Sequence, residues 1–74
     1  MKPNHFRLVS GSGKDRQTIA TLTIIGIEDI SAEQYSSVGT NLLVALKSLV
    51  TDKPVSVELV SLAQDGSKPI FIYQ

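Results

Sequence analysis

The sequence predicts a small α+β domain, in which a single four-stranded, mostly antiparallel sheet carries one helix packed on one face. Two observations lead to this fold class. Apolar residues recur at helical spacing over residues 31–50. Four other segments are rich in β-branched or aromatic residues that alternate with a period of two. The order is therefore strand, strand, helix, strand, strand (ββαββ), and 74 residues are expected to form one domain, residues 1–74.

The helix has clear start and stop signals. Ser31 and Gln34 fit a capping box, in which each side chain bonds the other residue's backbone N–H. Pro54 disfavours helical geometry at Lys53, so the helix should end near Thr51. The apolar positions between these signals are Tyr35, Val38, Leu42, Ala45, Leu46 and Leu49.

The strands are expected at residues 5–10, 17–27, 54–62 and 69–73. A polar loop rich in Gly and Ser joins the first two, and Asp65-Gly66 predicts a tight turn before the last. The last strand is apolar on both faces, which favours a central place beside the first and the spatial order 2-1-4-3. The order 1-2-3-4 is the alternative. The first of these layouts resembles that of ubiquitin-like β-grasp modules; the resemblance covers the layout alone, and no functional residue carries over.

Charge and composition exclude several classes of function. Seven basic and seven acidic side chains cancel, which disfavours nucleic acid and anionic membrane as partners. No cysteine is present to form a disulfide or a thiolate metal site. No apolar run is long enough to span a membrane, and the first residues lack the apolar core of a secretory signal. A cytoplasmic protein is the expectation.

No pattern indicates catalysis, a metal or a cofactor, so the chain is not expected to be an enzyme. The sole histidine, His5, is expected to be exposed, and it has no second histidine or cysteine to share a metal with. The segment Gly11-Ser12-Gly13-Lys14 departs from a phosphate-binding loop, because Leu8 and Asp15 occupy two required positions and a strand follows instead of a helix. A plain hairpin loop is the simpler interpretation.

The helix can cover only one face of the sheet, and the other face is expected to expose an apolar patch that calls for a protein partner. The predicted function is a non-enzymatic protein-binding module, acting as a homodimer or as an accessory or inhibitor subunit of a larger protein. The binding residues are expected on that face and on a small-residue flank of the helix: Thr23, Ile25, Phe71, Tyr73, Gly39 and Leu43.

Simpler alternatives remain for both surfaces. The patch is interrupted by His5, Arg7 and Glu58 and could stay hydrated, and the helix flank could be buried in the chain's own sheet. The alternative function is nucleic-acid or phosphate binding by the sheet face and the basic hairpin loop. Its candidate anion-binding residues are Arg7, Lys14 and Arg16.

Overall fold

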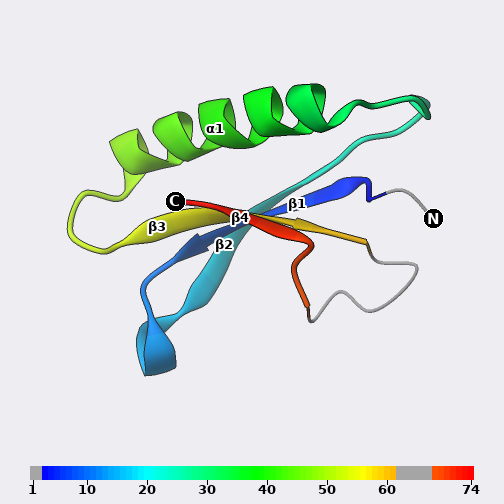
Figure 1. Cartoon of the computed structure of the whole chain (residues 1–74). Coiled ribbons are helices and arrows are strands. Elements are labelled where there is room, and N and C mark those ends of the chain that lie inside the picture. The colour runs from blue at the N-terminus through cyan, green and yellow to red at the C-terminus, as the bar shows by residue number, and fades with distance from the viewer. Residues whose placement is uncertain (1–2, 62–67) are drawn as a thin grey trace.

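A computed structural model of the chain describes residues 3–61 and 68–74. One four-stranded sheet carries a single long helix on one face, as the sequence predicts (Figure 1). The elements in chain order are β1 (His5–Ser10), the short 3-10 helix η1 (Gly13–Asp15), β2 (Gln17–Thr23), α1 (Ala32–Leu49), β3 (Val55–Val60) and β4 (Phe71–Tyr73). The predicted Asp65-Gly66 turn lies outside the described residues.

The strand order is β2-β1-β3-β4, and every neighbouring pair is antiparallel. Both orders expected from the sequence are therefore wrong. β3, not β4, lies beside β1, because it offers six paired residues where β4 offers three. Gly11 extends this pairing by donating its N–H to the carbonyl of Pro54 at 2.8 Å. β4 lies at an edge, so the β-grasp layout does not hold.

The helix begins and ends where its local signals place it. Ser31 is the N-cap: its hydroxyl accepts from the Gln34 N–H at 3.1 Å, and its own N–H donates to the Gln34 side chain at 2.8 Å. Val50 is the C-cap, and its N–H donates to the carbonyl of Leu46 at 3.1 Å. Within the described residues, this helix is the longest element and is not apolar enough to cross a membrane.

The core lies between α1 and the middle of the sheet. The helix packs most extensively on β3, and also on β1 and β4. Across one row of paired residues on this face, Leu22 is 40% exposed, Phe6 0%, Leu59 4% and Phe71 55%. Burial is therefore complete at the two central strands and falls off towards both edges.

Candidate protein-binding surfaces

Phe71 and Tyr73 lie on the helix-covered face of the sheet, which corrects the prediction that they line the opposite face. Cross-strand partners share a face, and Tyr73 pairs with Val57 while Phe71 pairs with Leu59, both core residues. Tyr73 is buried, and its ring lies 4.7 Å from that of the exposed Phe71. The face on which Phe71 and Tyr73 lie is set by the register between β3 and β4, and this register cannot be read from the sequence of β4 alone.

Gly39 and Leu43 are also buried within the chain's own fold. Leu43 belongs to the core cluster, and the ring of Tyr73 packs directly against Gly39. A Cβ built on Gly39 would lie only 2.5 Å from Cδ2 of Tyr73. The close approach that glycine permits here is therefore made by β4, so these two residues do not form the external flank predicted from the sequence.

The face opposite the helix carries a charged cluster. Val9 and Val60 on this face are buried, so the broad apolar patch expected there is not exposed. Glu58 of β3 accepts from Nε of Arg7 at 2.9 Å and from Arg16, which precedes β2, at 2.6 Å. Two guanidinium groups from different segments thus meet one buried carboxylate, and Arg16 links the start of β2 to β3.

Burial of Glu58 raises the pKa of its carboxyl, but two positive partners more than offset this effect. Hydrogen bonds from Arg16 and Arg7, and attraction to both of their charges, hold the pKa of Glu58 below its ordinary value. Glu58 therefore stays ionised at neutral pH and attracts both arginines. Of the three candidate anion-binding residues, Arg7 and Arg16 converge on this carboxylate, while Lys14 lies apart in η1.

His5 is buried on the same face, whereas the sequence suggested an exposed position. Its Nδ1 forms a hydrogen bond with the hydroxyl of Thr23, which is opposite it on β2, at 3.0 Å. Thr23 is nevertheless an exposed residue, and Ile25 just beyond it is 85% exposed. Thr23 and Ile25 are the two predicted binding residues that lie together on the surface.

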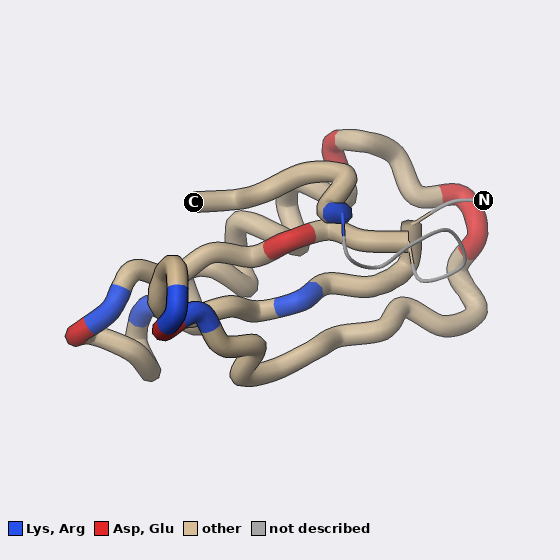
Figure 2. Tube along the Cα trace, turned by 90° about the horizontal axis from the view of Figure 1, so that it is seen from below, with Lys and Arg blue, Asp and Glu red and all other residues tan. Residues whose placement is uncertain are grey.

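The remaining charges gather at the two ends of the sheet. Figure 2 shows most of the basic segments at one end of the sheet, where acidic segments also lie, and acidic segments at the other end. Lys14 and Arg16 directly precede β2, whereas Glu28 and Asp29 follow it. β2 therefore runs from a loop of mixed charge, in which Asp15 lies between Lys14 and Arg16, to an acidic segment.

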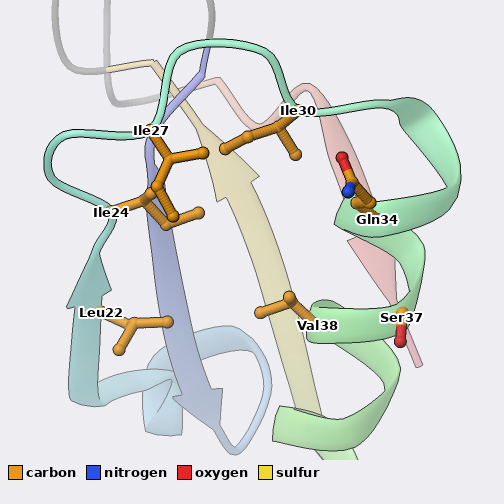
Figure 3. A pocket seen from close by; sticks show the side chains of 7 residues that line it. All are labelled: Leu22, Ile24, Ile27, Ile30, Gln34, Ser37 and Val38. Atoms are coloured by element: carbon orange, nitrogen blue, oxygen red, sulfur yellow. The ribbon is translucent and has the colours of Figure 1, made fainter.

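An apolar groove lies between β2 and α1. Leu22, Ile24 and Ile27 point into it from the β2 side, and Ile30 and Val38 point towards them from the helix side (Figure 3). Gln34 and Ser37 supply the few polar atoms at its rim, and its volume is about 380 Å³. The groove exists because α1 packs over β1, β3 and β4 and leaves the helix-side face of β2 uncovered.

All seven residues of β2 are exposed, and β2 forms one edge of the sheet. The exposed apolar side chains that it or the following segment contributes are Ile19, Leu22, Ile25 and Ile27. An edge strand also presents unpaired backbone N–H and C=O groups. We name the groove and the edge beside it together the β2 surface, which comprises Ile19, Leu22, Thr23, Ile24, Ile25, Ile27, Ile30 and Val38.

Sequence reasoning found Thr23 and Ile25 but missed the groove itself. The available signal was that both faces of the second strand are apolar or threonine-lined, which indicates a strand that needs cover on both sides. Comparison with protein-family models, curated proteins and solved structures gives no match. Among the described residues, no group of three His, Cys, Asp or Glu side chains is placed to hold a metal ion.

Proposed function

We propose that the protein is a small, non-enzymatic protein-binding module and that the β2 surface is its binding site. One observation carries the proposal: all seven residues of β2 are exposed, whereas the two central strands are largely buried and Tyr73 of β4 lies under the helix. Monomeric proteins rarely expose a contiguous apolar surface without a partner for it.

Two kinds of interaction are available on this surface. The groove offers an apolar cavity lined by Leu22, Ile24 and Val38, which an apolar side chain of a partner would fill. The backbone of β2 offers hydrogen bonds to an added strand, which is how many sheet proteins bind extended segments. Affinity would come from both, because strand addition places partner side chains beside the groove.

Site-specific photo-crosslinking in cells of the source organism tests the proposal. A photoreactive phenylalanine analogue replaces Leu22 in one variant and Val44 in a matched control. Val44 is 64% exposed on the helix and lies outside the groove. We expect adducts of higher mass at position 22 and none at position 44. Adducts at neither position, or equal adducts at both, would contradict the proposal.

A further inference from the structure

We propose that the occupant of the β2 surface is a second copy of this chain, whose β2 pairs antiparallel with β2 across a two-fold axis. The two four-stranded sheets then form one continuous sheet, with both helices on the same side. This inference rests on the proposed function, because it names the partner of the same surface.

The β2 edge lacks the features that usually keep edge strands apart. Its sequence from Gln17 to Thr23 contains no charged residue and no proline. The exception is a β-bulge opposite Leu8 and Val9, which breaks the regular pattern near Ile19. The segment beyond it, residues 20–23, pairs regularly with β1 and is available for a second partner. The other edge, β4, has three paired residues.

The backbone of β1 and β2 sets the register of such a pair. Ile24 donates its N–H to the carbonyl of Asn4, the residue before β1, at 2.7 Å, so its backbone groups point towards β1. Backbone groups alternate in direction along an antiparallel strand, so those of Thr21 and Thr23 point outwards. The symmetric arrangement that uses both threonines is centred on Leu22, between them. Leu22 of one copy then faces Leu22 of the other on the groove side, and the two grooves meet.

The charges at the ends of β2 favour the antiparallel direction. Lys14 precedes β2, whereas Glu28 and Asp29 follow it, so these charges lie beyond opposite ends of the strand. Pairing centred on Leu22 would bring Lys14 of one copy to the same end of the paired strands as Glu28 and Asp29 of the other, twice in each dimer. A parallel arrangement would place like charges together. Opposite charges across an interface select the orientation of the partners.

The helix does not obstruct this pairing. α1 packs on β3, β1 and β4, so the helix-side face of β2 has room for the Leu22 side chain of a second copy. The apolar residues that the dimer would cover are the ones that the isolated chain exposes beside β2. Burial of this surface adds to the backbone hydrogen bonds between the two strands.

A charge-exchange experiment tests both the partner and the direction. Sedimentation equilibrium measures the dimer dissociation constant of the unmodified chain, of Lys14→Glu and of Glu28→Lys. We expect each variant alone to dimerise about tenfold more weakly, because each one creates two repulsive pairs. An equimolar mixture of the two variants restores both attractive pairs, so a heterodimer as tight as the original dimer is expected.

The register has its own test, because the chain contains no cysteine. Leu22→Cys should form an intermolecular disulfide rapidly under copper-phenanthroline oxidation, since facing residues of a non-hydrogen-bonded pair lie about 4.5 Å apart between Cα atoms. Val44→Cys and Thr18→Cys serve as controls and should crosslink slowly. Circular dichroism checks that each variant is folded.

The outcomes separate this inference from the proposed function. The inference is overturned if the chain stays monomeric at millimolar concentration. It is also overturned if the dimer dissociation constant is unchanged in the charge variants and Val44→Cys crosslinks fastest. If photo-crosslinks at position 22 then join the chain to a different protein, the proposed function stands. If position 22 gives no adduct either, both proposals fail.

Discussion

The helix packs against one edge strand of the sheet, β4, but not to the same extent against the other, β2. At the β4 edge, Tyr73 lies under Gly39 and is buried, although its neighbours Phe71 and Ile72 are 55% and 42% exposed. At the β2 edge, Leu22 and its neighbours line an open groove, although they are as apolar as the residues of β4. A single helix is too narrow to cover four strands, so one part of this sheet becomes core and another becomes surface. The uncovered edge is therefore where binding is expected.

The largest effect should come from a pair of truncations that compares the covered and open sides. Phe6 and Leu22 are cross-strand partners, but Phe6 is fully buried and Leu22 is not. We expect Phe6→Ala to lower the free energy of unfolding by about 3–5 kcal/mol. Leu22→Ala should cost less than about 1 kcal/mol at concentrations where the chain is monomeric.

Urea denaturation of both variants gives the comparison directly. Similar losses for Phe6→Ala and Leu22→Ala would mean that β2 is covered in solution as well as β1, and the contrast between the two sides would disappear. A Leu22→Ala cost that grows with protein concentration would instead indicate that association buries this side chain.

The next largest effect should come from Glu58→Gln, which weakens the link between the start of β2 and β3. Glutamine keeps the size of the side chain but leaves Arg7 and Arg16 without their carboxylate, and we expect a loss of about 2 kcal/mol at pH 7. The folded pKa of Glu58 lies below its unfolded value of about 4.5, so its stabilising contribution is present above that unfolded pKa. This contribution is lost as the pH falls through the folded pKa.

Urea titrations at pH 7 and at about pH 3 check this sign. The stability difference between the unmodified chain and Glu58→Gln should shrink on acidification. A difference that is constant with pH would show that the two hydrogen bonds do not depend on the charge of Glu58. Glu33→Gln, an exposed change in the first turn of α1, serves as the control for a general effect of removing one negative charge.

A smaller effect is expected where the helix meets β4. Gly39→Ala adds a methyl group against the ring of Tyr73, which should cost about 1–3 kcal/mol through overpacking. Alanine also favours the helix by about 1 kcal/mol over glycine, so the net loss should be near 1 kcal/mol. The exposed neighbour Thr40→Ala should be neutral or stabilising. If thermal unfolding shows that Gly39→Ala is more stable than the original chain, the Tyr73 ring must move away from the added methyl group at little cost, and its contact with the helix would be weak.

An effect of similar size is expected at the helix end beside the groove. Ser31→Ala removes the N-cap hydrogen bond and should lower the free energy of unfolding by about 1 kcal/mol. Ser48→Ala, near the other end of α1, removes a hydroxyl that donates to the carbonyl of Ala45 and should have a weaker effect. Urea denaturation followed by circular dichroism at 222 nm measures both. Equal losses would show that the capping box adds nothing beyond an ordinary side-chain hydrogen bond.

The sequence by itself determined which elements form and where the helix and the first strand begin and end. The fold class, the capping box at Ser31 and Gln34 and the first strand follow from signals within a few residues of one another. The second strand ends at Thr23, before the predicted residue 27, because beyond Ile24 the chain turns away from β1 towards the helix. Local propensity can indicate that a segment is extended, but it cannot determine over how many residues that segment pairs with a neighbouring strand.

Only the tertiary structure decided the strand order, the face on which Tyr73 lies and the side of the sheet that the helix leaves open. Alternation shows that Phe71 and Tyr73 share a face, but which face depends on their register with β3. The helix position depends on Gly39 accepting the Tyr73 ring, a contact between residues far apart in the chain. Such non-local contacts compete with alternatives that satisfy the same local patterns equally well, and the packing of the whole chain selects among them.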